Sequence, residues 1–238
     1  MSAMNLKFAA RNFFGIYPAV FFPFYGIKQK NRAKAVCKTT QIIIEGFPRS
    51  ANTWTVLAFK YAQPTPVKIA HHLHVPAQVI KAIKLKIPSL VLIRKPKDAV
   101  TSLLVHSPDI SVWLALRAYM SFYNKLIHYR AGYVVATFED ATHHLDKVIE
   151  AVNTRFRTEF VPPRLSNRDV EIVFEQIDDE NRRGNGVEKR RLARPSSAKD
   201  AAKHFAISRI EAPNHRHILE DTEVVYREFV STCGKDSK

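Results

Sequence analysis

The segment 42–54 constrains the fold more than any other part of the chain. The apolar run Ile-Ile-Ile breaks into the short polar loop Glu-Gly-Phe-Pro-Arg-Ser-Ala and restarts as a predicted helix. At such a junction the first backbone N–H groups of the helix are unpaired, and the positive end of its dipole points to the same place. The segment therefore predicts an anion site, to which side chains add a cation and hydrogen-bond donors: Arg49, Ser50, Asn52 and Thr53.

Three further apolar runs, at 67–70, 90–93 and 133–138, are predicted as strands. Segments with helical spacing lie between and after them. The longest apolar stripe of this kind comprises Val112, Leu116, Tyr119, Tyr123 and Ile127. Continuous apolar strands that alternate with helices predict an α/β domain, with a central parallel sheet flanked by helices on both faces.

The second half of the chain is predicted to be mainly helical. One apolar stripe covers 145–156, a helix start is predicted at 166–169, and a closing helix carries Val224, Val225 and Phe229. The stretch 182–194 is the most basic of the chain, and its glycines predict an exposed loop. Glu139 and Asp140 follow a strand and are expected to cap the next helix.

Lysine and arginine together number 37 and aspartate and glutamate 22, which gives a formal charge of +15. This balance predicts a positive field that attracts phosphates, sulfates, nucleic acid or acidic membranes. No nucleic-acid-binding motif accompanies the charge, so no nucleic acid is expected as a partner. Cys37 and Cys233 lie far apart without metal-ligand spacing, which favours a reducing, cytoplasmic compartment.

Residues 1–38 form an N-terminal arm that precedes the α/β domain predicted at 39–238. The segment 8–27 is rich in aromatic residues and has basic flanks, but Arg11, Pro18 and Pro23 argue against a membrane span. Two interpretations remain open. The segment lies in a membrane interface as a peripheral contact, or it packs its aromatic side chains on the domain or on a partner.

A second strand-to-helix junction repeats the logic of the first. The run 90–93 leads through Arg94-Lys95-Pro96 into a helix that carries Ser102. If that helix leans back across the sheet edge, Arg94 and Ser102 reach one anion. Two anion sites at neighbouring strand ends suit a ligand with a phosphate at each end.

These two junctions resemble the nucleotide-binding motifs of sulfotransferases that use 3′-phosphoadenosine 5′-phosphosulfate (PAPS). Pro48 through Trp54 is similar to the family's 5′-phosphosulfate loop, Pro-Lys/Arg-Ser-Gly-Thr/Asn-Thr-Trp. Arg94 and Ser102, eight positions apart, resemble its 3′-phosphate motif. The resemblance implies a P-loop NTPase-like sulfotransferase fold and sulfuryl transfer from PAPS, without a metal, to a hydroxyl or amine of an unidentified acceptor.

The resemblance also implies roles for single residues. Arg49 would neutralise the departing phosphate, the loop from Ser50 to Thr53 would wrap the 5′-phosphate, and Trp54 would stack on adenine. Arg94 and Ser102 would hold the 3′-phosphate. Ala51 stands where the family commonly has glycine, so a positive φ at this position would be costly.

A histidine acts as general base in the family, and the chain offers His71, His72 and His74. His74-Val75-Pro76 fits the family wording best, although alternation along a strand puts His72 on the same face. A neutral imidazole, with an ordinary pKa of about 6.5, can accept the proton of an acceptor hydroxyl. The family's late basic loop corresponds to Arg182-Arg183-Gly184 or to the cluster 189–194, and the spacing does not decide between them.

Other classes of protein remain as alternatives. A nucleotide-dependent kinase or NTPase places its phosphate loop at the same junction, but the motif Gly-x-x-x-x-Gly-Lys-Ser/Thr is absent from the sequence. A non-enzymatic module that binds anionic ligands or membranes would also account for the charge. Because no acidic or cysteine ligand neighbours the three histidines in sequence, no zinc site is expected.

Overall fold

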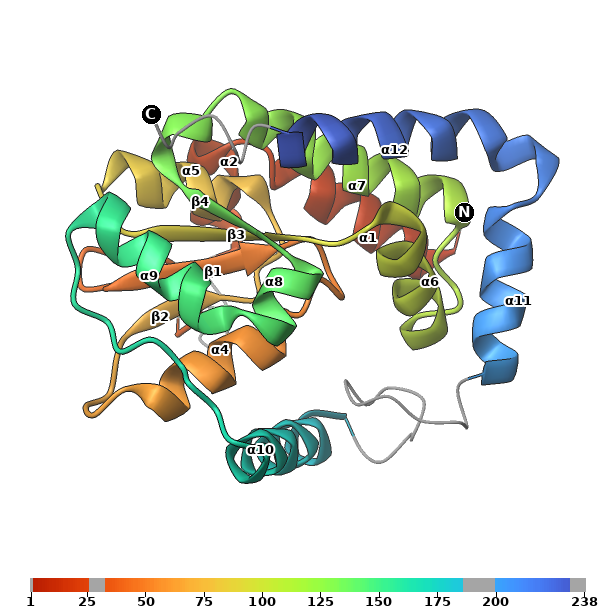
Figure 1. The fold of residues 1–238 in the computed structure, drawn as a ribbon. Coiled ribbons are helices and arrows are strands. Elements are labelled where there is room, and N and C mark those ends of the chain that lie inside the picture. The colour runs from red at the N-terminus through yellow and green to blue at the C-terminus, as the bar shows by residue number, and fades with distance from the viewer. Residues whose placement is uncertain (1, 26–32, 186–199, 232–238) are drawn as a thin grey trace.

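The computed structural model describes residues 2–25, 33–185 and 200–231. In these residues the chain forms a four-stranded sheet covered by helices (Figure 1). The strands are β1 (Ile42–Gly46), β2 (Ile69–His71), β3 (Ser89–Ile93) and β4 (Val134–Thr137). The helices are α1 (Ala3–Phe14), α2 (Pro18–Tyr25), α4 (Asn52–Ala62), α5 (Pro76–Lys84), α6 (Pro96–His106), α7 (Val112–Ile127), α8 (Phe138–His143), α9 (Leu145–Phe156), α10 (Asn167–Asn185), α11 (Asp200–Ile210) and α12 (Arg216–Ser231). Short 3₁₀ turns lie at Arg130–Gly132 and Pro213–His215.

The sheet is parallel throughout, in the order β2-β1-β3-β4. β1 pairs with β3 so that Gly46 lies opposite Leu92, and β3 pairs with β4 so that Ile93 lies opposite Thr137. The chain passes from β1 to β2 on one side and then returns to β3 on the other side of β1. This reversal places a topological switch point between the carboxyl ends of β1 and β3, where ligands of open α/β sheets bind.

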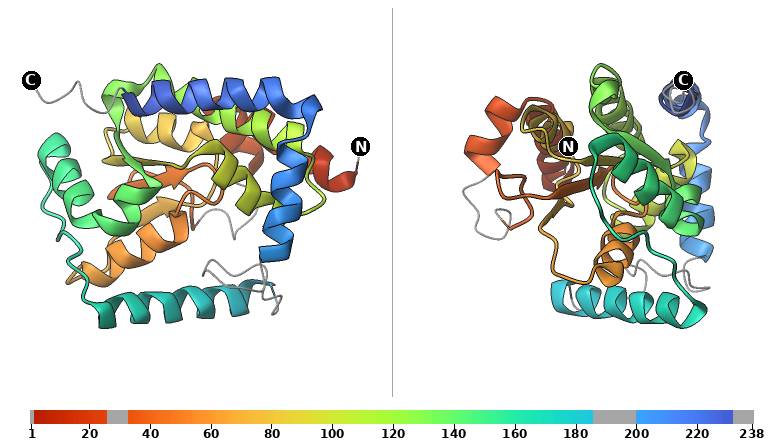
Figure 2. Two further views of the ribbon diagram at one scale, coloured as in Figure 1. Left: turned by 45° about the vertical axis from the view of Figure 1, so that its right-hand side comes forward. Right: turned by 60° about the vertical axis from the view of Figure 1, so that its left-hand side comes forward.

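Two apolar layers cover the sheet, as the continuous apolar strands predict. Ile43, Val91 and Ile93 pack with side chains of α5, α6, α7 and α12 on one face. The alternate residues of the same strands, among them Ile44 and Leu92, pack with α4, α9 and α10 on the other. Burial of each such side chain contributes about 1.5–3 kcal/mol. Helices lie on both faces of the sheet (Figure 2), which confirms the predicted α/β class.

Capping residues set where several helices begin. Thr137 and Asp140 form a reciprocal capping box at the start of α8, which confirms the capping role expected of Asp140. Ser166 and Asp169 make the same exchange ahead of α10: the Ser166 amide donates to Asp169 at 2.8 Å, and the Asp169 amide donates to Ser166 Oγ at 3.3 Å. These contacts satisfy amides that have no partner within the helix.

The N-terminal arm packs on the domain as two helices. α1 lies against α7 and α2 against α5. Phe8 joins the core beside α7, and Phe21 is buried against Leu73, Val75 and Ala77. The Ala77 amide donates to the Gly15 carbonyl at 2.9 Å at the corner between α1 and α2. None of the helices in the described part of the chain combines the length and apolar character needed to cross a bilayer.

The C-terminal region differs from the sequence prediction in one respect. The closing helix is present as α12, with Val225 and Phe229 buried. The exposed loop predicted over 182–194 is wrong for its first part, because α10 continues through Arg182 to Asn185. The cluster 189–194, with Gly186, Pro195 and Cys233, lies outside the described residues.

Candidate functional site

The loop after β1 leads directly into an uncapped helix. β1 ends at Gly46 and α4 begins at Asn52, as the sequence predicts. Ala51, the residue before the helix, provides no side-chain cap, and both Arg49 and Ala51 have positive φ, at 71° and 68°. The amides of the first helical turn have no acceptor within α4, so the loop presents unpaired N–H groups at the positive end of the helix dipole.

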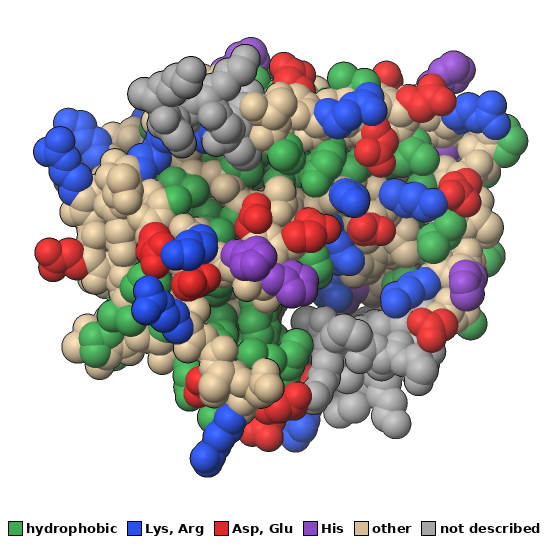
Figure 3. Space-filling model, viewed as in Figure 1, with side chains coloured by type: hydrophobic (Ala, Val, Ile, Leu, Met, Phe, Trp, Pro, Cys, Tyr) green, Lys and Arg blue, Asp and Glu red, His purple; other side chains and the backbone are tan. Residues whose placement is uncertain are grey.

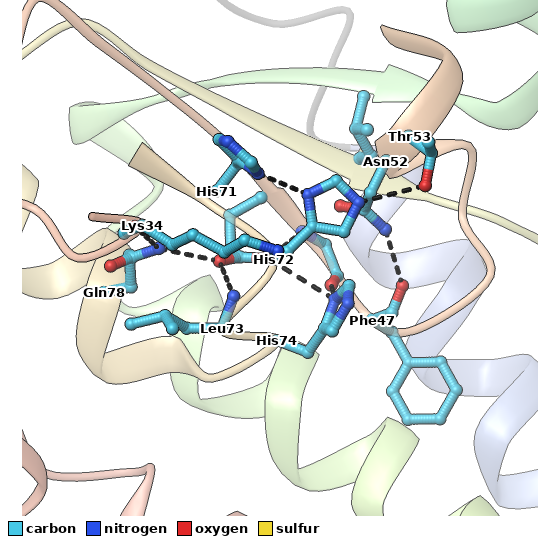
Figure 4. A network of polar contacts seen from close by, with 12 residues as sticks. Lys34, Phe47, Asn52, Thr53, His71, His72, Leu73, His74 and Gln78 are labelled. Atoms are coloured by element: carbon cyan, nitrogen blue, oxygen red, sulfur yellow. Dashed lines mark hydrogen bonds and ion pairs between the residues drawn. The ribbon is translucent and has the colours of Figure 1, made fainter. Parts of the chain in front are cut away.

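Buried hydrogen bonds fix the shape of this loop. The Asn52 side chain donates to the Phe47 carbonyl at 3.1 Å (Figure 4), and the Phe47 amide donates to the Tyr123 hydroxyl at 3.3 Å. Gly46 is required where β1 approaches β3, because a Cβ at this position would lie 2.5 Å from the Leu92 carbonyl oxygen. The loop is therefore held from α4, from α7 and from the neighbouring strand.

The junction after β3 repeats this arrangement. α6 begins at Pro96, and Lys95 before it provides no side-chain cap. Two hydroxyls of α7 hold the end of β3: Tyr123 donates to the Leu92 carbonyl at 2.8 Å, and Tyr119 donates to the Arg94 carbonyl at 2.7 Å. Both tyrosines belong to the stripe that the sequence predicts as core. Helical spacing predicts that these two side chains are buried, but it does not predict the hydrogen bonds of their hydroxyls.

The two junctions meet at one pocket. Arg49 Nε donates to Ser102 Oγ at 3.0 Å, and an Arg94 terminal nitrogen donates to the Arg49 carbonyl at 3.2 Å. Together with Thr101 and Lys203, these residues line a cavity of about 210 Å³. In Figure 3, Lys and Arg side chains are interspersed with Asp and Glu side chains on the face shown. The structure thus brings Arg49, Arg94 and Ser102 together at the switch point between β1 and β3.

The electrostatics of the pocket favour an anion. Burial, together with the charge of Arg94, lowers the pKa of Arg49 to about 10. Burial also lowers the pKa of Arg94, while the carboxylates of Asp98 and Glu139 oppose this shift. Both guanidinium groups remain cationic at neutral pH. Among the described residues, the buried Thr101 hydroxyl has no hydrogen-bond partner, so the pocket offers two adjacent cations and an unused hydroxyl.

Three histidines occupy the end of β2, beside the same loop (Figure 4). His72 Nε2 lies 3.0 Å from Thr53 Oγ1, and its Nδ1 contacts His71 Nδ1. His74 Nδ1 lies 2.8 Å from the Gly46 carbonyl, which can only accept, so Nδ1 carries the hydrogen. His74 Nε2 then has a free lone pair, and it has no hydrogen-bond partner within the described part of the chain. His74 therefore has the tautomer in which Nε2 carries no hydrogen.

The buried carboxyl group of Glu45 lies beside the Nδ1 atom of His74. Glu45 Oε1 lies 3.4 Å from His74 Nδ1, and Glu45 Oε2 accepts from the Leu73 amide and the Gln78 side chain, each at 2.9 Å. Burial raises the pKa of Glu45 to about 7, although these donors oppose the shift. Burial also lowers the pKa of His74 well below its usual range, so this imidazole is neutral. Glu45 is not among the residues that the sequence predicts for the site, because it lies inside an apolar strand.

The remaining predicted site residues lie in and behind the loop. Ser50 is fully buried within it. Trp54 donates through Nε1 to the Ala141 carbonyl at 3.1 Å, and its ring packs 5.1 Å from that of Phe174. The indole is thus held between α8 and α10, and adenine stacking stays a prediction. In the described part of the chain, no cluster of three or more His, Cys, Asp and Glu residues is arranged to hold a metal ion.

Solved structures similar to this chain exist, whereas two other comparisons found no match. No protein-family model matches the chain, and no curated protein matches it by sequence. The crystal structure of mouse sulfotransferase SULT7A1 complexed with PAP is similar over 81% of this chain and 91% of that chain, with 8% sequence identity and a TM-score of 0.42. This likeness assigns no family.

The left-handed alanine at the loop gives a stability test. Relief of a strained Ala51 is worth about 1–2 kcal/mol, and the added freedom of glycine in the unfolded chain costs about 0.4–1 kcal/mol. We expect Ala51→Gly to raise the free energy of unfolding, measured in urea, by about 0.5–1 kcal/mol. Ala58→Gly, buried in the middle of α4, serves as the control and should destabilise by about 1 kcal/mol. Equal destabilisation by both changes would contradict the positive φ at position 51.

Proposed function

We propose that this protein binds PAPS across the β1 and β3 junctions and transfers its sulfuryl group to a hydroxyl or amine acceptor. One observation carries the proposal: Arg49, Arg94 and Ser102, which match two separate phosphate motifs, share a pocket between two uncapped helix starts. Two anchored anion sites at adjacent strand ends suit a nucleotide with phosphates at its 3′ and 5′ positions.

In this proposal each junction binds one end of the nucleotide. The amides at the start of α4 and the guanidinium of Arg49 hold the 5′-phosphate, where negative charge grows as the sulfur–oxygen bond to the phosphate breaks. Arg94 and Ser102 hold the 3′-phosphate. Preorganised cations and amides stabilise such charge without reorganising during the reaction, as they do in phosphoryl transfer.

His74 acts as the general base. The acceptor oxygen forms a bond to sulfur, the bridging sulfur–oxygen bond breaks with its electron pair on the phosphate, and the acceptor proton goes to His74 Nε2. The Gly46 carbonyl at 2.8 Å and the Glu45 carboxylate at 3.4 Å hold Nδ1–H and favour the tautomer with Nε2 free. Glu45 also stabilises the imidazolium that forms, in the way a buried carboxylate supports a catalytic histidine.

The first test separates the two phosphate contacts. Arg94→Ala and Ser102→Ala should each weaken binding of 3′-phosphoadenosine 5′-phosphate (PAP), about ten-fold or more for Arg94→Ala, because a charged hydrogen bond contributes about 1.5–3 kcal/mol. AMP, which lacks the 3′-phosphate, should be nearly unaffected. Isothermal titration calorimetry measures both ligands. Arg117→Ala, an exposed cation on α7, controls for net charge, and equal losses for PAP and AMP would contradict the assignment.

The second test identifies the base. His74→Ala should lower release of PAP from PAPS, measured with p-nitrophenol as a probe acceptor, by about 10²-fold or more, while PAP affinity stays unchanged. Removal of the exposed His143 should change neither quantity. If His74→Ala remains active and His72→Ala does not, the choice of base is wrong.

A further inference from the structure

The docked arm leaves one side of α1 uncovered. Several large side chains of α1 and the turn after it are exposed, among them Leu6 (60%), Phe13 (66%), Phe14 (49%) and Tyr17 (52%). By contrast Phe8, on the opposite side of α1, is buried against α7. Figure 2 shows α1 at the periphery of the molecule. We call Leu6, Phe13, Phe14 and Tyr17 the α1 face, and an exposed apolar group of this kind marks an interaction site.

The helices around the α1 face carry positive charge without any negative charge. α1, α2, α5 and α7 pack on one another, and their sequences contain no aspartate or glutamate. Their basic residues are Lys7, Arg11, Lys81, Lys84, Arg117 and Lys125. Lys7 is exposed on α1 itself, and Lys125 Nζ lies 5.0 Å from the centre of the Tyr17 ring. The α1 face is therefore an aromatic surface bordered only by cations within these four helices.

This combination selects one occupant by its charge. Aromatic side chains favour the boundary between headgroups and acyl chains, and neighbouring lysines attract anionic headgroups. A protein partner would require a matching acidic and apolar surface, whereas an anionic bilayer supplies both features at once. The length and apolar character of the described helices do not suffice for a span, so the contact is peripheral.

We propose that the α1 face binds the surface of an anionic lipid bilayer, with Phe13, Phe14 and Tyr17 at the headgroup boundary and Lys7 and Lys125 beside lipid phosphates. This proposal does not depend on PAPS binding. It assigns the two earlier interpretations of the arm to its two sides: Phe8 and Phe21 pack on the domain, while the outer side of α1 faces lipid.

Vesicle binding by the full chain tests this proposal. We expect co-sedimentation with vesicles of phosphatidylcholine containing about one-third phosphatidylserine, and little with phosphatidylcholine alone. The double change Phe13→Ser and Phe14→Ser should weaken binding by about ten-fold or more, because both aromatic rings leave water when the chain binds lipid. Phe205→Ser is the matched control, since Phe205 is 65% exposed on α11, which packs on α6; it should change binding less than about two-fold.

A second measurement keeps the test independent of folding defects. In a Phe13→Trp variant, the emission of the new indole should shift to the blue and be quenched by brominated lipid only in the anionic vesicles. Three results would overturn the proposal: no binding to anionic vesicles, binding that the Phe13 and Phe14 changes leave intact, or self-association that these changes abolish without any vesicle binding. Binding that survives the Phe13 and Phe14 changes would show that net charge alone attracts the protein to the vesicles. Self-association that these changes abolish would show that the α1 face is an interface between copies of the chain.

Discussion

Two guanidinium groups lie side by side where β1 and β3 end, and the rest of the site is arranged around that fact. Placing Arg49 and Arg94 next to each other costs free energy, because each is partly removed from water and repels the other. Arg49 compensates through Ser102 Oγ, and Arg94 through the Arg49 carbonyl. An anion between the two groups would remove the repulsion. The folded chain thus contains a charge arrangement that a bound anion would stabilise.

Helix α7 makes this arrangement rigid. The hydroxyls of Tyr119 and Tyr123 donate hydrogen bonds to the carbonyls of Arg94 and Leu92, respectively. The Tyr123 hydroxyl also accepts a hydrogen bond from the Phe47 amide. Both junctions are therefore fixed from one helix, so that the distance between them is set by packing rather than by loop conformation. A binding site gains affinity when its groups are positioned before the ligand arrives. On its far side α7 also supports α1, which connects the proposed lipid surface to the same scaffold.

The sequence predicted those features that local patterns determine. Apolar runs located all four strands, and the polar break at 46–51 located the loop. The positive φ at Ala51 is a finding of the structure. Features that depend on tertiary contacts were not predictable. The apolar residues of α11 show no single stripe. The contact between Glu45 and His74 joins residues 29 positions apart, and the contact of His74 Nδ1 with the Gly46 carbonyl also depends on the folded chain.

The central claim is that one site binds two phosphate groups of the same ligand at a fixed separation. Calorimetric titration with two isomers, adenosine 3′,5′-bisphosphate and adenosine 2′,5′-bisphosphate, tests it most directly, because the ligands have the same composition and charge. The account predicts one site per chain and about ten-fold or more tighter binding of the 3′,5′ isomer at physiological salt, where long-range attraction is screened. Equal affinity for the two isomers would show that the basic surface attracts anions without a built site, and would contradict the account.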